Sequence, residues 1–216
     1  MKGAEKRMNI NNRSLVFGKV IKEYQLPLNE VYQLNTVYEK EKDKLESFGN
    51  RLAGRLDSEL DFTSIIEKYD IYKSITECMS DYINSCKAFY NSHYEAPNFD
   101  QYKINLEIIS CWINDMKAGE YNPPHTHHNN QGWSTVLFLK IPHFVNDLKK
   151  DAHRFRDGQI FFQGTNVDGG QWIMPEVGNF YIFEACHTHL VMPFKTVKDT
   201  DVRRSMSFNF IEKTNV

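Results

Sequence analysis

Three histidines occur within four residues of each other in the segment NPPHTHHNNQGW, residues 122–133. Side chains at positions i and i+2 of a β-strand point to the same face, so His125 and His127 can reach one metal ion together. By the same parity His128 points the other way and is not expected to be a ligand. An isolated pair of this kind is a weak signal, because surface loops also contain histidines.

A second segment, ACHTHLVMPF at residues 185–194, adds His187 and His189. His189 begins a predicted strand that can lie beside the first segment in a β-sandwich. Two imidazoles from one strand and a third from a distant strand suit a metal that keeps open coordination positions. We therefore predict a metal site at His125, His127 and His189. His187 is the main competitor, because it has the same strand parity as His189.

A basic residue near the C-terminus suggests what this metal could be for. In the segment RRSMSFNF, Arg203 and Ser205 are two residues apart and lie on one face of the last predicted strand. An arginine presents a fork of donors that suits a carboxylate, and a serine hydroxyl beside it can add one hydrogen bond. A metal next to an anchored carboxylate suggests a cosubstrate that chelates the metal at one end and is held at the other.

The elements that must position these residues are short strands in the C-terminal half. They are rich in β-branched and aromatic residues and are separated by Gly, Pro, Asn and Asp. Strands at this spacing, without long helical inserts, favour an antiparallel sandwich or barrel. The predicted strands are 104–114, 133–142, 158–165, 171–185, 189–194 and 203–213.

Before about residue 100 the apolar residues recur at helical spacing. Residues 27–48 predict a helix with Pro27 at its start. A second helix is predicted from Ser64, which forms a capping-box pattern with Glu67, through about residue 92. Its apolar face is interpreted as core packing. An early strand is predicted at 14–21.

No linker-like stretch separates the two halves of the chain. We therefore predict a single α+β domain over residues 1–216. In this prediction residues 1–100 form a mainly helical N-terminal support, and residues 101–216 form the β-core that carries the site.

Composition excludes several functional classes. The net charge of −2 offers no clustered basic face for nucleic acid. No apolar run predicts a signal peptide or a membrane span. The four cysteines are scattered without a CxxC pair, which is typical of a reducing cytoplasm. We expect a cytoplasmic protein that binds neither membrane nor nucleic acid, while the sequence indicates no oligomeric state.

Five short motifs in a fixed order point to a family. They are WIN (112–114), PPHTH (123–127), PEVG (175–178), HLVMPF (189–194) and RRSMSFN (203–209). Together they resemble the iron(II)- and 2-oxoglutarate-dependent oxygenases, and more narrowly a phage and bacterial branch related to prolyl hydroxylases. The resemblance covers about residues 104–211 and implies a double-stranded β-helix, or jelly-roll, with the metal between its two sheets.

The resemblance also implies a cofactor set and roles for residues. Iron(II) would bind near His125 and His189, and 2-oxoglutarate would chelate it and pair its distal carboxylate with Arg203 and Ser205. Asn114, 11 residues before His125, takes the place of an Asn that contacts the cosubstrate. The reaction would consume O₂ and 2-oxoglutarate, release succinate and CO₂, and hydroxylate a C–H bond. Ascorbate is compatible as an accessory reductant.

One position departs from the family pattern, whose first motif is HxD. Here it is His125-Thr126-His127, without the carboxylate. Either His127 serves as a neutral third ligand, or His127 and Asn129 form the pair and His125 lies outside the metal shell. Loss of the carboxylate makes the iron site more positive and changes its metal preference.

The resemblance favours a prolyl residue of a peptide or protein as the substrate, in the host cytoplasm if a phage encodes the chain. Trp112, Tyr121, Trp133 and Trp172 could line a substrate groove, although Trp112 and Trp172 read better as core. Three other readings stay open: a cupin-like protein, a zinc-binding β-barrel hydrolase or lyase, and a noncatalytic phage β-sandwich binding module.

Overall fold

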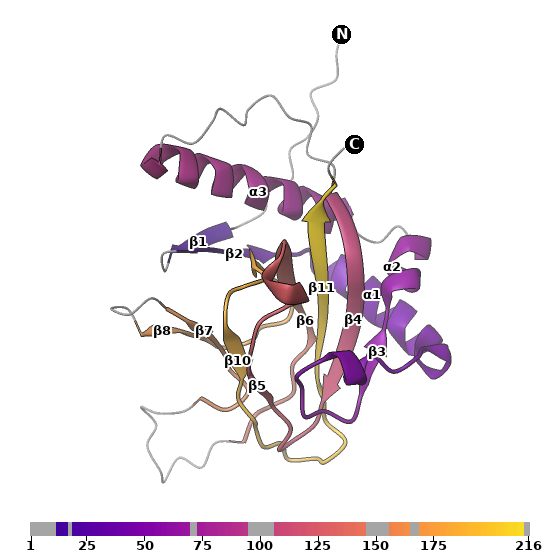
Figure 1. Cartoon of the computed structure of the whole chain (residues 1–216). Coiled ribbons are helices and arrows are strands. Elements are labelled where there is room, and N and C mark those ends of the chain that lie inside the picture. The colour runs from indigo at the N-terminus through magenta and orange to yellow at the C-terminus, as the bar shows by residue number, and fades with distance from the viewer. Residues whose placement is uncertain are drawn as a thin grey trace.

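Two antiparallel sheets face each other, and three helices lie against the outer face of the larger sheet (Figure 1). The computed structural model describes residues 12–16, 19–69, 73–94, 106–145, 156–164 and 169–213. Every strand pairing among these residues is antiparallel. This arrangement confirms the predicted α+β fold with a jelly-roll core.

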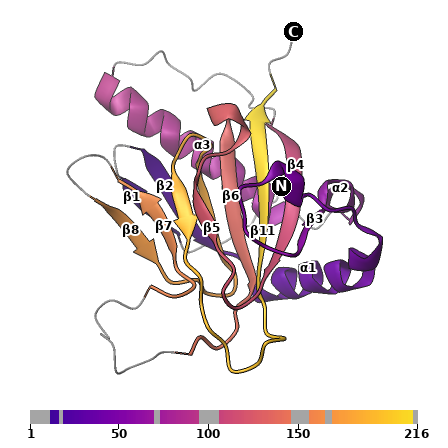
Figure 2. The same cartoon turned by 60° about the horizontal axis from the view of Figure 1, so that its bottom comes forward.

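The larger sheet has the strand order β1-β2-β9-β6-β11-β4-β3, and the smaller sheet has the order β5-β10-β7-β8 (Figure 2). The strands of the larger sheet are β1 (Asn12–Val16), β2 (Val20–Gln25), β9 (Asn179–Glu184), β6 (Trp133–Lys140), β11 (Arg203–Glu212), β4 (Leu106–Met116) and β3 (Glu59–Asp61). Those of the smaller sheet are β5 (Asn122–His125), β10 (His189–Val191), β7 (Ile160–Gln163) and β8 (Gly170–Ile173).

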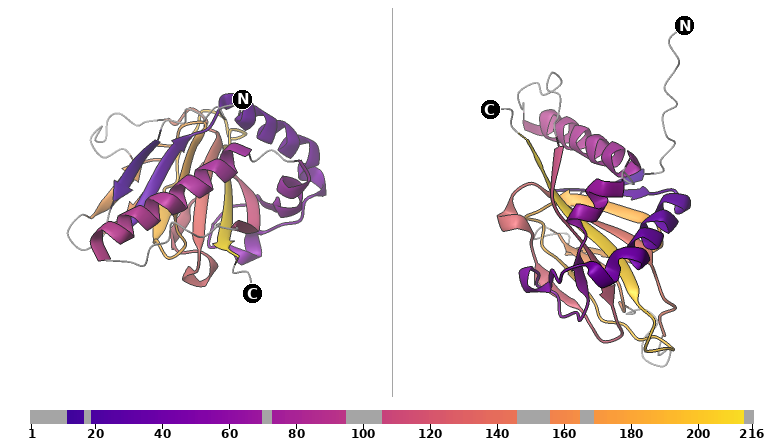
Figure 3. Two further views of the ribbon diagram at one scale, coloured as in Figure 1. Left: turned by 90° about the horizontal axis from the view of Figure 1, so that it is seen from above. Right: turned by 90° about the vertical axis from the view of Figure 1, so that its right-hand side faces the viewer.

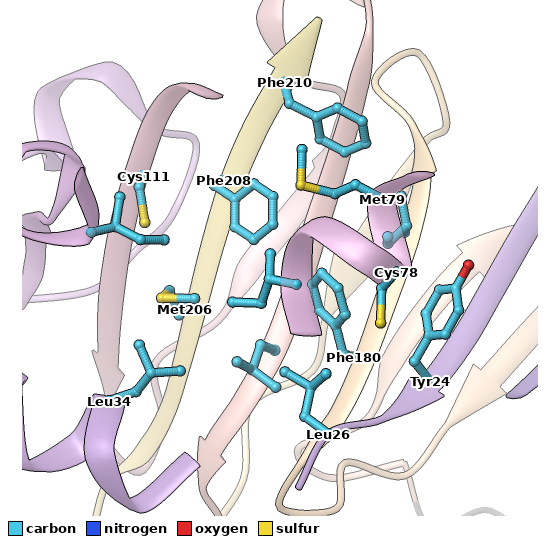
Figure 4. Packing of buried hydrophobic residues seen from close by; sticks show 14 of the residues in the cluster. Tyr24, Leu26, Leu34, Cys78, Met79, Cys111, Phe180, Met206, Phe208 and Phe210 are labelled. Atoms are coloured by element: carbon cyan, nitrogen blue, oxygen red, sulfur yellow. The ribbon is translucent and has the colours of Figure 1, made fainter. Parts of the chain in front are cut away.

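The two faces of the larger sheet differ in their surroundings, as the residues of strand β11 show. Its residues alternate between polar and apolar types, and all from Arg203 to Phe210 are buried. Met206, Phe208 and Phe210 pack in the core beneath the helices (Figure 4). Arg203 and Ser205 point the other way, into the space between the sheets. Because side chains alternate along a strand, one row of β11 side chains packs in the core and the other row lines the space between the sheets.

The helices cover the larger sheet, and α3 crosses its strands when seen from above (Figure 3). They are α1 (Leu28–Glu41), α2 (Thr63–Tyr69) and α3 (Lys73–Tyr94), with short 3₁₀ turns η1 (Lys42–Lys44), η2 (Gly49–Arg51) and η3 (His128–Asn130). Cys78, Met79 and Tyr82 of α3 are buried, which agrees with the predicted apolar face. None of the helices in the described ranges has the length and apolar character that a membrane crossing needs.

Four predicted elements differ from the observed ones. The helix expected over 27–48 ends at Glu41, because the backbone N–H of Phe48 donates to the carbonyl of Glu59 and the segment lies along β3. The second helix consists of two helices, α2 and α3, and Asp61 rather than Ser64 caps α2 by accepting from the N–H of Thr63 at 2.9 Å.

The strand expected at 171–185 is also two strands. Its halves, β8 and β9, lie in different sheets, and the PEVG turn separates them. Gly178 in that turn has φ 89°, which favours glycine. The strand expected at 14–21 falls on parts of β1 and β2, with residues 17–18 outside the described ranges.

Candidate metal centre and anion pocket

Strand pairing brings the two histidine segments together. His125 is the last residue of β5 and His189 is the first residue of β10, and the two are direct partners in the antiparallel register. With His127 they form a group whose candidate ligand atoms all lie within 4.8 Å of one another. Two nitrogens that each lie ~2.1 Å from one metal ion can be at most ~4.2 Å from each other. Small movements of the rings would therefore bring all three nitrogens within reach of one metal ion.

His127 joins the group through tertiary contacts rather than through strand parity. Strand β5 ends at His125, so the two-residue rule does not extend to His127. Its backbone N–H donates to the carbonyl of Ala185 at 2.8 Å. Its ring stacks on Trp112, with centroids 5.6 Å apart and planes at 20°. The expected meeting of the two side chains therefore occurs for a different reason.

Backbone carbonyls set the tautomers of two of these rings. Nδ1 of His125 donates to the carbonyl of Pro123 at 2.7 Å, and Nδ1 of His189 donates to the carbonyl of His187 at 2.9 Å. A carbonyl can only accept, so the hydrogen of each neutral ring sits on Nδ1. Each Nε2 then presents a lone pair to the centre, which is the arrangement that a metal ligand requires.

The histidines of this centre are neutral at physiological pH. Burial lowers the pKa of His127 to about 3 and holds the pKa of His189 well below 6.5. Burial also lowers the pKa of His125, against the opposing effect of its bond to Pro123. Metal ions bind neutral imidazole, so these rings need not lose a proton first.

The other candidate ligands lie elsewhere. The ring of the buried His187 meets the carbonyl of Gln163 through Nε2 at 2.9 Å, and only its backbone carbonyl serves the centre. Asn129 is exposed, with φ 49° in η3, and does not line the cavity at the centre. The side chain of His128 lies outside those that the structure describes.

Arg203 is a buried cation without a counter-ion. Its side chain lines the same cavity as the three histidines and is only 2% exposed. The guanidinium lies over the ring of Phe138 at 4.8 Å and its Nη1 lies 3.9 Å from Met116 Sδ, while Nε and Nη2 have no partner. No described acidic residue forms an ion pair with it, and burial lowers its pKa to about 9. Such a group has free donors for an anion.

Asn114 and Ser205 lie beside this cation. They are direct partners across β4 and β11, both are buried, and both line the cavity. Oδ1 of Asn114 has no hydrogen-bond partner. The structure thus places all six residues that the sequence singled out, His125, His127, His189, Arg203, Ser205 and Asn114, around one cavity.

Sequence reasoning did not predict Glu59 at this cavity, and it favoured a core position for Trp112. Glu59 of β3 is a carboxyl that is 4% exposed, and β3 has only three residues, too few to show a period. Trp112 is buried as predicted, but it also lines the cavity, and its ring stacks against the ring of His127. Neither Tyr121, Trp133 nor Trp172 lines it.

A second cavity shares four lining residues with the first, namely Leu52, Ala53, His125 and His127. It is the wider of the two, about 270 Å³ against about 40 Å³. Its remaining lining residues are Phe48, Arg51, Ile109, Ser110, Thr126 and Asn209. Oδ1 of the buried Asn209 has no partner there. The histidines therefore stand between a narrow cavity that ends at Arg203 and a wider one on the other side.

Comparison with known proteins agrees with this geometry. The family described as "Putative 2OG-Fe(II) oxygenase" matches residues 110–209. A Pseudomonas putida prolyl-4-hydroxylase structure has a TM-score of 0.56 at 14% identity, covering 95% of both chains. Viral collagen prolyl hydroxylase from Paramecium Bursaria Chlorella virus-1 has a TM-score of 0.54 at 14% identity, covering 88% of this chain and 94% of that one.

A third solved structure is a Trichoplax adhaerens prolyl hydroxylase in complex with a hypoxia inducible factor peptide fragment. It has a TM-score of 0.53 at 14% identity and covers 86% of this chain and 78% of that one. At these identities the likeness shows the jelly-roll fold. A search of curated protein sequences found no match to this chain.

Proposed function

Because residues 110–209 match the 2OG-Fe(II) oxygenase family and so confirm the resemblance seen in the sequence, we propose that this chain is an iron(II)- and 2-oxoglutarate-dependent dioxygenase. It hydroxylates a C–H bond and releases succinate and CO₂. The family match and the fold support the reaction class. The residue roles below are proposed from the cavity.

The observation that carries this proposal is the pairing of Arg203 with the histidine centre in one cavity. A buried guanidinium with two unpartnered nitrogens is costly unless an anion occupies the space in front of it. Three neutral imidazoles at the other end are suited to a divalent metal. A dicarboxylate that reaches from the metal to Arg203 satisfies both requirements.

The residues present fit iron(II) and 2-oxoglutarate. We assign His125, His127 and His189 as ligands, with Nε2 of His125 and His189 already directed inward by their Nδ1 bonds. Arg203 and Ser205 hold the distal carboxylate, and Asn114 offers an amide to the cosubstrate. When bound, the metal with its cosubstrate supplies oxygen activation.

His127 is the proposed replacement for the carboxylate of the family pattern. Its ring lies in the centre, with Nε2 at 3.1 Å from Nε2 of His189, whereas Asn129 is exposed. The alternative pair of His127 and Asn129, with His125 outside the shell, has less support because His125 faces His189 at a ring distance of 4.3 Å.

For the substrate we propose a prolyl residue of a peptide or protein. The wider cavity on the far side of His125 and His127 offers a place for it. Two of the similar structures are named prolyl hydroxylases of bacterial and viral origin, and a third carries a peptide fragment. We further propose that residues 1–216 form one cytoplasmic domain, with residues 1–100 supporting a core at 101–216, and that ascorbate serves as a reductant.

The test is succinate formation from 2-oxoglutarate by protein loaded with iron(II) under anaerobic conditions and then exposed to O₂, with and without a proline-rich peptide. Arg203→Ala is expected to lose most 2-oxoglutarate binding, and Arg203→Lys, which keeps the charge but not the fork, to recover part of it. Circular dichroism confirms that each variant is folded.

The absence of iron-dependent 2-oxoglutarate binding to the wild-type chain would overturn the proposal. Zinc-supported hydrolysis of an ester without 2-oxoglutarate would favour the zinc hydrolase instead. Succinate formation that peptide does not stimulate would keep the reaction class and refute the prolyl substrate.

A further inference from the structure

Glu59 is a buried acid that no described residue neutralises. Its side chain lines the cavity that holds the three histidines and Arg203, and the residue is 4% exposed. None of the hydrogen bonds and ion pairs among the described residues involves its carboxyl, and the carboxyl oxygens keep some contact with solvent through the cavity. Ionised carboxyls without partners are rare in protein interiors because they are costly, and a cation in the same cavity would lower that cost.

Strand register directs Glu59 into the site. It pairs with Asn114 across β3 and β4, and Asn114 pairs with Ser205 across β4 and β11. Directly paired residues share one face of a sheet, so the three side chains form a row along the cavity wall. The row extends from the edge strand to the strand that carries Arg203.

The backbone at Gly54 lies close to the carboxyl of Glu59. A Cβ at Gly54 would lie 2.5 Å from Oε1 of Glu59 and 2.5 Å from Oδ1 of Asn122. Both distances are shorter than a real contact, so the side chains of Glu59 and Asn122 would have to shift if Gly54 carried a Cβ. The Glu59 carboxyl therefore lies close to the backbone of Gly54 at the cavity wall.

The charges of the metal, its ligands, the cosubstrate and Arg203 do not balance without a further carboxylate. Iron(II) carries two positive charges, and three neutral histidines remove none of them. The family's HxD motif would supply one negative charge, which His127 does not. With doubly negative 2-oxoglutarate and positively charged Arg203 in place, the cavity keeps one excess positive charge. Among the described residues that line it, Glu59 is the only acidic one.

We propose that Glu59 is the charge-balancing carboxylate of the three-histidine centre, acting from β3 without coordinating the metal. The inference rests on the proposed function, since it needs a divalent metal at His125, His127 and His189. Glu59 is accordingly a positioning residue, and its effect is electrostatic.

Protonation links Glu59 to the metal. Burial raises the pKa of Glu59 to about 7, and the negative charge of Glu120 adds to the shift. The other titratable groups that line the same cavity are Arg203 and the three histidines. A divalent cation in the same cavity favours the ionised carboxylate, so its proton passes to the buffer when the metal binds. The buried histidines are already neutral and release none.

The test is calorimetric titration of the full-length protein with iron(II) at pH 7, under anaerobic conditions, in two buffers of different ionisation enthalpy. For the wild type we expect release of a substantial fraction of one proton per iron. Glu59→Gln should release almost none and bind iron on the order of tenfold more weakly. Glu59→Asp should keep the proton release and most of the affinity.

Glu107→Gln is the matched control, because Glu107 is an exposed residue of β4 that pairs with Lys213 outside the cavity. It should behave as the wild type. Equal affinity and equal proton release in Glu59→Gln and wild type would overturn the inference and leave the proposed function standing. The same holds if Glu59→Gln binds iron normally and loses only substrate affinity. Failure of the wild type to bind iron would instead refute the proposed function.

Discussion

Nε2 of His127 lies 3.1 Å from Nε2 of His189, although 62 residues separate them in the sequence. Their rings are stacked, with centroids 4.9 Å apart and planes at 8°. Because His189 carries its hydrogen on Nδ1, its Nε2 can only accept, and His127 must donate the hydrogen between them. To offer Nε2 to a metal, His127 must therefore adopt the tautomer that carries its hydrogen on Nδ1.

The first prediction concerns the ligand set. Single substitutions His125→Ala, His127→Ala and His189→Ala should each weaken iron(II) binding by on the order of 100-fold, because a facial set of three loses one donor. Asn129→Ala is the control and should bind as the wild type does. Equilibrium dialysis followed by metal analysis measures the affinities. Retained binding in His125→Ala together with lost binding in Asn129→Ala would assign the other ligand pair.

The second prediction concerns the stability of the metal-free protein in acid. Folding lowers the pKa of His125, His127 and His189. Below about pH 6.5 these histidines are therefore protonated in the unfolded chain but remain neutral in the folded chain. The contribution of these histidines to stability is therefore complete above pH 6.5 and falls as the pH drops. Each histidine can contribute up to ~1.4 kcal/mol per pH unit. Urea unfolding at pH 7.5, 6.5 and 5.5 measures the slope, which His189→Gln should reduce.

The third prediction concerns Glu59, whose contribution to stability changes with pH in the opposite direction to that of the histidines. Folding raises its pKa from 4.5 to about 7, so the folded chain keeps a proton that the unfolded chain loses between these values. This contribution to stability is present at low pH and is lost as the pH rises to about 7. Relative to wild type, metal-free Glu59→Gln should gain on the order of 1 to 2 kcal/mol between pH 5 and pH 8. An identical difference at both pH values would contradict a raised pKa.

The fourth prediction concerns the aromatic stack that supports His127. Trp112 lies between Phe48 and His127, at ring distances of 5.5 and 5.6 Å. Trp112→Leu should lower iron affinity on the order of tenfold, because His127 loses the surface that orients it, and should cost ~3 kcal/mol of stability.

Trp172→Leu is the matched control for that stack. Trp172 is half-buried on β8 and packs on Phe161. Its variant should keep wild-type iron affinity when both are titrated below their unfolding temperatures. A Trp112→Leu protein that is destabilised but binds iron normally would show that the stack serves folding alone.

Much of the site could be predicted because it depends on short-range pattern. Arg203 and Ser205 share a face because β11 has a period of two, and that period is visible in RRSMSFNF. The pairing of His125 with His189 follows from two strand-like segments in a jelly-roll. Boundaries were harder to predict, as at Glu41, where contacts with β3 rather than local propensity end the helical run.

The sequence by itself determined which residue types alternate along each strand, and so which side chains could reach the site. Only the tertiary structure decided that Trp112 orients His127 beyond the end of β5, and that a three-residue strand brings Glu59 into the row of Asn114 and Ser205. The physical reason is that alternation is a property of one strand, whereas the position of a ring or a charge opposite another depends on the register between strands.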